Sequence, residues 1–357
     1  MRPIAFYVGL ANLRGTSIAS YDYAEGSETV LGRRALILID EAAPHDPLAI
    51  ERFQRRFPVI ACDGPDAIDR ALERERAEIV HVLKGDGRDK WVARAAPTAV
   101  HQVFPVWPRD IHGERYAFVS RWLARYSAGP KAAWVPHVVA LPAASGDLRA
   151  ELQIPADAMV AGCHGSPECI ELDFVRRALA RALDARRDFY FVGLNLAPFL
   201  QHSRAIFLPG TADTTRKRRF IDTCDVMVHA RHKGETFGLS VAEFSICNRP
   251  VFAWSGNARR AHFDMLGDAA LRYRGERDLL RMLLHLDRGE LSRRDWDRYS
   301  RDYAPEPVMA RFDDVFIRNP ADPARLRSTL VGPDEFSLGG LARYARRWRR
   351  RLRGKGP

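Results

Sequence analysis

Glu235 and Glu243 are two carboxylates separated by seven residues in the segment GETFGLSVAEF. The backbone N–H groups of Phe237, Gly238 and Leu239 lie between them, where a helix is expected to begin and where free N–H groups suit a diphosphate. Gly238 would let a phosphate approach the backbone closely. Glu235 would lie near whatever the phosphate carries, and Glu243, one to two turns further along, could accept hydrogen bonds from a ribose. Spacing alone also fits a helix-start carboxylate followed by one on a solvated face.

The segment that carries these residues is predicted to be a strand, a turn, a helix and a second strand. Residues 224–230 (CDVMVHA) are short, β-branched and apolar, which is typical of a buried parallel strand. Residues 239–246 supply the apolar positions of the helix, which Pro250 ends. Residues 251–254 begin the next strand. Units of this kind place ligands where helices begin, beyond the carboxyl ends of the strands.

Two glutamates at this spacing, with Phe-Gly-Leu soon after the first and a strand on each side, resemble the donor-site motif of retaining glycosyltransferases with the GT-B fold, of the group 1 or family 4 type. The resemblance extends over most of residues 1–317 and is strongest at 213–254. It implies that Glu235 contacts the donor sugar, that Glu243 holds the ribose and that the amides of 237–239 bind the diphosphate. It also implies an α/β protein in which two Rossmann-like domains face each other across a cleft.

The length of 357 residues favours two domains of ordinary size, and 46% hydrophobic with 28% charged residues suits a soluble globular protein. We predict an acceptor-side domain at 1–142 and a linker rich in Ala, Ser, Gly and Pro at 143–157. A donor domain follows at 158–317, and a tail occupies 318–357. No apolar run approaches the length needed to cross a bilayer.

Alternation of apolar runs with helical patterns predicts a parallel sheet covered by helices in each domain. In the first half, strands are expected at 4–8, 35–40, 58–62, 78–83 and 98–104, with helices at 47–56 and 65–76. In the second half, strands are expected at 158–163, 189–193 and 205–208, with helices at 172–183, 257–266 and 276–286. Another helix should open after Tyr303, and the resemblance implies that the last helices pack back on the first domain.

Two candidate positions lie in the first domain. The loop after the first strand contains Arg14, Gly15 and Thr16, which the resemblance places near the acceptor or the donor phosphates; an ordinary capped turn fits equally well. His101 lies near a strand end and is expected to face the cleft. The resemblance implies a histidine near the reacting sugar there, so His101 is a catalytic candidate beside Glu235, although a lone strand histidine is more often structural.

The donor domain departs from the expected phosphate clamp. Many relatives of the resembling family place an arginine–lysine pair against the diphosphate, but Cys163-His164 occupies the position where arginine is expected. The remaining donor-binding candidates follow predicted strands or carry positive charge, and they are His164, Gly165, Asn195, Lys217, Arg231 and Lys233. The basic ones compete with a solvated-surface interpretation. His229, inside an apolar strand, favours a hydrogen-bonded core residue over a ligand contact.

Cysteine and carboxylate patterns give no sign of a metal. The five cysteines, Cys62, Cys163, Cys169, Cys224 and Cys247, are scattered, which fits reduced thiols in a cytoplasmic protein. Cys163-His164 and Cys169 lack a second pair at a zinc-ligand spacing. The Asp-x-Asp sequence at 295–297 lies in a charged stretch and is interpreted as solvated surface. We therefore expect neither a metal nor a cofactor, with the nucleotide sugar as substrate.

The positive charge is concentrated at the C-terminus. Residues 341–357 contain eight Arg and Lys and no acidic residue, and removing eight from the net charge of +11 leaves +3. Leu341, Tyr344, Trp348 and Leu352 recur at helical spacing, so this segment resembles a basic amphipathic anchor for an anionic membrane surface. That would make the protein cytoplasmic and peripheral at the inner face of the membrane. A disordered arginine-rich end that binds polyanions indiscriminately is the alternative.

The expected activity is transfer of a sugar from a nucleoside-diphosphate sugar to an acceptor hydroxyl, with retention and without a metal. The acceptor would be a glycan or a lipid-linked saccharide. A GT-B-shaped nucleotide-sugar epimerase would share the donor half and is one alternative. A non-enzymatic nucleic-acid binder, suggested by a pI of about 9.7, is another. The concentration of charge in the tail and the lack of a recognised nucleic-acid motif argue against specific nucleic-acid binding.

Overall fold

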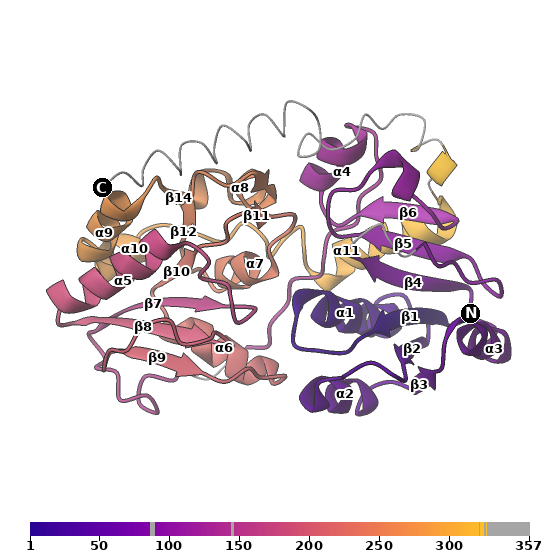
Figure 1. Ribbon diagram of the computed structural model, residues 1–357, viewed down its shortest axis with the longest axis horizontal. Coiled ribbons are helices and arrows are strands. Elements are labelled where there is room, and N and C mark those ends of the chain that lie inside the picture. The colour runs from indigo at the N-terminus through magenta and orange to yellow at the C-terminus, as the bar shows by residue number, and fades with distance from the viewer. Residues whose placement is uncertain (86–89, 144–145, 321, 325, 327–357) are drawn as a thin grey trace, which may run out of the picture.

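The structure is a computed structural model that describes residues 1–85, 90–143, 146–320, 322–324 and 326. In this described part, the chain forms two six-stranded sheets in two lobes that lie side by side (Figure 1). All strand pairs within the two sheets are parallel. The α/β architecture of two Rossmann-like domains predicted from the sequence is confirmed.

The first sheet has the order β3 (Val59–Cys62), β2 (Ala35–Asp40), β1 (Ile4–Gly9), β4 (Ile79–Lys84), β5 (Thr98–Gln102) and β6 (Arg115–Phe118). Its lobe also contains the helices α1 (Gly15–Thr29), α2 (Pro47–Gln54), α3 (Pro65–Glu75) and α4 (Arg121–Ala128). Sequence order reverses beside β1, so the loop after β1 lies at the topological switch point, where open parallel sheets bind ligands.

The second sheet has the order β14 (Ala270–Tyr273), β12 (Val251–Trp254), β10 (Val226–His229), β7 (Met159–His164), β8 (Phe189–Leu194) and β9 (Ala205–Leu208). Its helices are α5 (Asp173–Ala185), α6 (Thr214–Thr223), α7 (Leu239–Ile246), α8 (Ala261–Leu266), α9 (Glu276–Leu284) and α10 (Arg288–Ser292). A short pair, β11 (Gly234–Glu235) and β13 (Arg259–Arg260), lies beside this sheet. The reversal here occurs between β7 and β10.

The last described helix returns to the first lobe. α11 (Pro305–Asp313), followed by a π-helix over Asp314–Arg318, buries Val308, Met309, Phe312 and Phe316 in the core that contains Ile4 and Phe6 of β1. α11 is drawn in yellow among the indigo and magenta elements of that lobe (Figure 1). The connection at 146–157 has turns but neither helix nor strand. The last helices therefore pack back on the first domain, as the resemblance implies.

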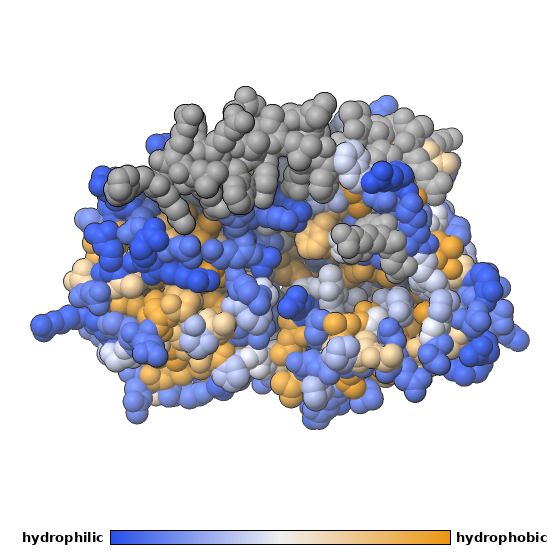
Figure 2. Space-filling model, viewed as in Figure 1, coloured by the Kyte–Doolittle hydropathy of each residue, from blue (hydrophilic) through white to orange (hydrophobic). Residues whose placement is uncertain are grey.

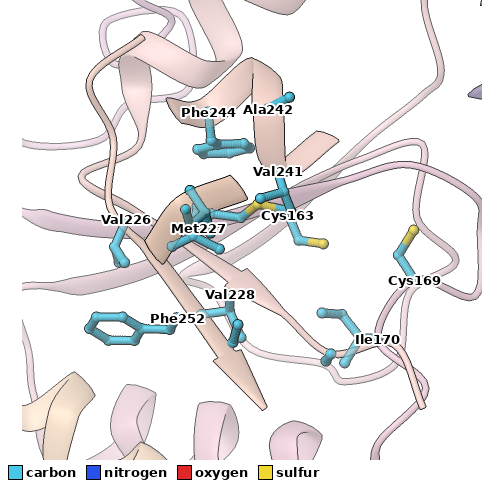
Figure 3. Packing of buried hydrophobic residues seen from close by; sticks show 14 of the residues in the cluster. Cys163, Cys169, Ile170, Val226, Met227, Val228, Val241, Ala242, Phe244 and Phe252 are labelled. Carbon is cyan, nitrogen blue, oxygen red and sulfur yellow. The ribbon is translucent and has the colours of Figure 1, made fainter. Parts of the chain in front are cut away.

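Helix α7 is held against the second sheet by its apolar side chains. Val241 and Phe244 are fully buried and lie with Val228 of β10 and Phe252 of β12 in one packed group (Figure 3). This packing fixes the direction in which α7 begins, toward the first lobe. The face drawn in Figure 2 has hydrophilic side chains with hydrophobic patches between them, and it is hollowed where the two lobes meet. Among the described residues, no helix is long and apolar enough to cross a membrane.

Candidate active site

A cleft of about 840 Å³ lies between the lobes and draws its lining from both. From the first lobe it receives the loop after β1 and residues near the ends of β4 and β5. From the second it receives the turns that follow β7, β8 and β10, together with the start of α7. The carboxyl ends of both parallel sheets therefore converge on one cavity, as the predicted facing domains require.

The start of α7 forms part of this wall. Gly238 has φ +95° and ψ 66°, a left-handed conformation that favours glycine. A Cβ at this position would also lie 3.0 Å from Cγ of Glu235. The N–H of Ala242 bonds to the carbonyl of Gly238, so the preceding N–H groups begin the helix without an intrahelical partner. The structure thus places these amides beside Glu235, as the sequence predicted.

Glu235 stands at the end of β11 and keeps 23% of its side chain exposed in the cleft. Nε2 of His229, at the end of β10, lies 3.0 Å from its Oε1. Burial opposes ionisation of this carboxyl, but the hydrogen bond from His229 and the charges of Arg231 and Arg259 outweigh it and lower its pKa. Glu235 is therefore a carboxylate at neutral pH. The interpretation of His229 as a hydrogen-bonded core residue is confirmed.

Glu243 lies deeper, with only 5% of the residue exposed. The Lys217 ammonium donates to its Oε1, and Nε2 of His164 lies 2.9 Å from its Oε2. Burial opposes ionisation, yet the neighbouring Lys217 and His164 lower the pKa of Glu243 to about 2. The three side chains line the cleft together. A nucleotide that reaches Glu243 would therefore meet a paired carboxylate with both oxygens already in contact.

The remaining donor-side candidates lie on the turns after β7, β8 and β10. Asn195 has a left-handed φ of +59°, and its amide donates to the carbonyl of Gly165 at 2.6 Å. Arg231 forms an ion pair with Glu171 at 3.2 Å and donates to Oγ of Ser166 at 3.0 Å. All of these residues line the cleft. The structure brings every predicted donor-side residue together there, Lys233 included.

The acceptor-side candidates approach from the opposite wall. Arg14, Gly15 and Thr16 are exposed at the start of α1 and line the cleft. A Cβ on Gly15 would lie 3.5 Å from Cδ1 of Leu239, so the N-terminal ends of α1 and α7 approach one another. Asn12 orders the loop by accepting a hydrogen bond from the N–H of Arg14 at 2.9 Å. The predicted loop therefore faces the predicted donor wall.

The expectation that His101 faces the cleft is wrong. Its side chain is fully buried, Nε2 donates to the carbonyl of Val135 at 2.8 Å, and Nδ1 accepts from Nε2 of His81 at 3.1 Å. The ring of Phe316 lies 5.3 Å away and covers it. Burial lowers the pKa of His101 to about 4. This histidine belongs to the core of the first lobe and not to the lining of the cleft.

His137 lines the cleft instead, although only 4% of the residue is exposed. The Tyr23 hydroxyl donates to the carbonyl of Pro136 at 2.8 Å, so at 3.3 Å its oxygen must accept from Nδ1–H of His137. Nε2 then carries a lone pair and has no hydrogen-bond partner among the described residues. Its ring packs 4.9 Å from that of Phe237. Burial, with His101 nearby, holds the pKa of His137 well below its usual value.

The sequence matches no protein-family model and no curated protein. Solved structures do resemble the chain. HepE of Anabaena in complex with UDP-glucose has a TM-score of 0.61 at 12% identity, over 92% of this chain and 98% of that one. A glycosyltransferase from Rickettsia africae has a TM-score of 0.54 at 11% identity, over 89% and 100% of the two chains. A UDP-N-acetylglucosamine 2-epimerase, described as putative, from Listeria monocytogenes has a TM-score of 0.58 at 12% identity, over 90% and 99%. The two facing parallel-sheet domains are the GT-B fold.

Proposed function

We propose that this protein is a glycosyltransferase that moves a sugar from a nucleoside-diphosphate sugar to an acceptor hydroxyl, with retention and without a metal. One observation carries the proposal. The carboxylate of Glu235, the free amides at the start of α7 and the paired Glu243 lie on one wall of a cleft that the other lobe closes. Solved structures of the same fold hold UDP-glucose or UDP, which supports a nucleotide-sugar donor.

The side chains and amides of the cleft would stabilise the charges that develop during sugar transfer. The amides at the start of α7, with Lys217 and Arg231 nearby, would stabilise the diphosphate as it leaves. Glu235, ionised at neutral pH, would stabilise positive charge that develops on the sugar ring. His137, whose Nε2 has no donor among the residues that the structure describes, would accept a hydrogen bond from a sugar hydroxyl. Its neutral form at neutral pH suits this role.

The acceptor would enter from the first lobe, beside Arg14, Gly15 and Thr16 at the start of α1. These residues are exposed and lie opposite the start of α7. A glycan or a lipid-linked saccharide offers the hydroxyl group that the reaction needs. We therefore assign the loop to the acceptor and the second lobe to the donor.

The test is incubation of the protein with a panel of nucleotide sugars, with and without saccharide acceptors, followed by NMR of the products. Transfer with the anomeric configuration of the donor is expected, and EDTA should leave the rate unchanged because amides and side chains hold the diphosphate. Formation of an epimeric nucleotide sugar without acceptor would favour the epimerase. Complete loss on chelation, restored by magnesium or manganese, would overturn metal independence.

We also propose that the basic segment 341–357, which lies outside the described residues, attaches the enzyme to an anionic membrane surface near a lipid-linked acceptor. Each basic residue near such a surface contributes roughly 1 kcal/mol, and eight are present. Sedimentation with anionic vesicles should pellet the full chain more than a chain that ends at Gly340. Equal pelleting would remove the proposal, and release by high salt with no blue shift of Trp348 fluorescence would favour a polyanion-binding tail.

A further inference from the structure

Two buried histidines lie behind Glu235, on the side away from the cleft. His229 is 2% exposed and His262, at the start of α8, is fully buried, and their ring centroids are 4.8 Å apart. The carbonyl of His229 accepts a hydrogen bond from the hydroxyl of Tyr273 at 2.7 Å. The ring of Phe263 packs 4.2 Å from that of His262. The backbone and the ring of His229 are thus both held in place.

The hydrogen bonds of His229 assign its protons. Glu235 is a carboxylate and can only accept, so Nε2 of His229 carries the hydrogen that joins them. Nδ1 is buried and has no partner among the described residues. The donor that faces Glu235 is therefore Nε2–H of His229.

Other charged groups compete for the same carboxylate. Arg231, from the turn after β10, and Arg259, from β13, both act on Glu235. The thiol of Cys169 and the hydroxyl of Tyr299 also lie close enough for their ionisation to depend on its charge. Arg231 is already paired with Glu171 at 3.2 Å. The hydrogen bond from His229, at 3.0 Å, therefore orients the carboxylate of Glu235.

We propose that His229 is a positioning residue, whose Nε2–H holds one oxygen of Glu235 so that the other oxygen faces the sugar in the cleft. His262 and Tyr273 fix His229 in turn. The consequence for the reaction rests on the proposed function, but the orientation of Glu235 does not. A histidine inside a strand, six residues before the carboxylate, is usually interpreted as a packing residue. Here His229 would set the orientation of the Glu235 carboxylate relative to the sugar.

The test replaces His229 by glutamine and by asparagine. Both are neutral amides, but the glutamine nitrogen reaches the place of Nε2, whereas the asparagine nitrogen corresponds to Nδ1. The carboxyl resonance of Glu235 is followed by ¹³C NMR from acid to neutral pH and is assigned by its loss in Glu235→Gln. In His229→Asn the pKa of Glu235 should rise by about one pH unit because the donor is lost. In His229→Gln it should stay near the native value.

An equal pKa of Glu235 in all three proteins would overturn the proposal, and so would an equal rise in both variants. Thermal unfolding shows whether each variant is folded. If His229→Asn unfolds, Tyr273→Phe loosens His229 more gently and should still raise the pKa of Glu235; an unchanged value there would also overturn the proposal. His285→Gln, which changes an exposed histidine remote from the cleft, is the control and should alter nothing.

Turnover adds a second, separable measurement. With a donor sugar that the native protein transfers, His229→Asn should lower kcat roughly 10²-fold with little change in the donor KM, and His229→Gln should keep most of the activity. Similar kcat values in the native protein and His229→Asn would contradict the role in the reaction. If the native protein transfers no sugar, the proposed function fails, and the NMR comparison alone still decides whether His229 positions Glu235.

Discussion

Glu243 is almost wholly buried, and it neutralises Lys217 while contacting His164. Glu243→Gln keeps the shape but leaves the ammonium without its counter-charge, so the free energy of unfolding should fall by about 3–5 kcal/mol. Nucleotide binding should weaken as well. Urea denaturation and nucleotide titration measure both effects. Glu51→Gln breaks the exposed pair with Arg55 and should change stability by less than about 0.5 kcal/mol.

Glu235 should behave differently, because it faces the cleft and is only partly covered. Glu235→Gln retains a polar side chain of the same size but removes the negative charge next to the reacting sugar. Turnover should fall by about 10²–10³-fold with only a small change in the free energy of unfolding. Steady-state kinetics beside urea denaturation separates the two. Normal turnover in this variant would mean that the motif has been assigned the wrong role.

His101 makes the first lobe sensitive to acid. Burial lowers its pKa to about 4 in the folded protein, against about 6.5 in the unfolded chain. A lowered histidine pKa means that the unfolded state takes up the proton first, so stability is complete above about pH 6.5 and falls toward about pH 4, by on the order of 3 kcal/mol. His81 and His137, whose pKa values are also held low by burial, act in the same direction.

His101→Gln removes this titration while keeping a donor for the carbonyl of Val135. The urea midpoint of the variant should depend less steeply on pH between about 6.5 and about 4 than that of the native protein. Glu243 contributes at lower pH: with a folded pKa of about 2, its stabilisation is present above the unfolded value and is lost as pH falls toward 2. The pH ranges in which His101 and Glu243 affect stability are therefore separate. If the urea midpoint of His101→Gln depended on pH as steeply as that of the native protein, the prediction would be wrong.

The sequence predicted the donor wall well and the first lobe less well, for physical reasons. Glu235, Gly238 and Glu243 come from one continuous segment, so local geometry alone brings them together. The direction of His101 depends on Phe316, more than two hundred residues away, which covers it from the returning helix. His137 lies in an irregular link with no periodic pattern. No local signal could have selected it, and the only hint was a polar residue inside the apolar run WVPHVV.

At the scale of elements, most strands were predicted to within a few residues because parallel strands buried on both faces have continuous apolar sequences. Helix α6 was not predicted because its sequence TTRKRRFIDT is strongly charged and has only two large apolar residues, Phe220 and Ile221. Asp213 caps that helix by accepting from the N–H of Thr215 at 2.8 Å, and its charged residues find local partners such as Asp222. β11 and β13 have only two residues each, too few for a sequence pattern, and Arg272 interrupts the apolar residues of β14.

The turn into α7 depends on Gly238. Gly238→Ala should strain the backbone by about 1–2 kcal/mol because φ is positive, and the new Cβ would displace Glu235 as well. Donor binding and turnover should therefore fall together while the protein stays folded. Gly32→Ala is the matched control, since Gly32 has φ +64° with open space around it. It should lose similar stability and no activity. Equal activity in the two variants would mean that α7 does not need this geometry.

At the scale of the whole molecule, the chain crosses between the lobes twice. Helix α11 follows the donor domain in sequence but completes the core of the first lobe. Gly26 of α1 permits this packing, because a Cβ there would lie 2.6 Å from Cγ of Met309. Two segments of the chain therefore connect the lobes, one before β7 and one before α11. The predicted donor domain ends at residue 317. Helix α11 and the π-helix that follows it nevertheless pack in the core of the first lobe.

Phe312 offers a test of this arrangement in the full chain. Its side chain is fully buried beside Phe6 and Phe316, so Phe312→Ala should cost about 3–5 kcal/mol. Hydrogen exchange should show the loss in amides of β1 and β4, with β7 and β10 still protected. Leu279→Ala, which truncates a fully buried side chain of α9 in the second lobe, should give the opposite pattern. Loss of protection in the second sheet of Phe312→Ala, as large as in the first, would show that the two lobes unfold as one unit.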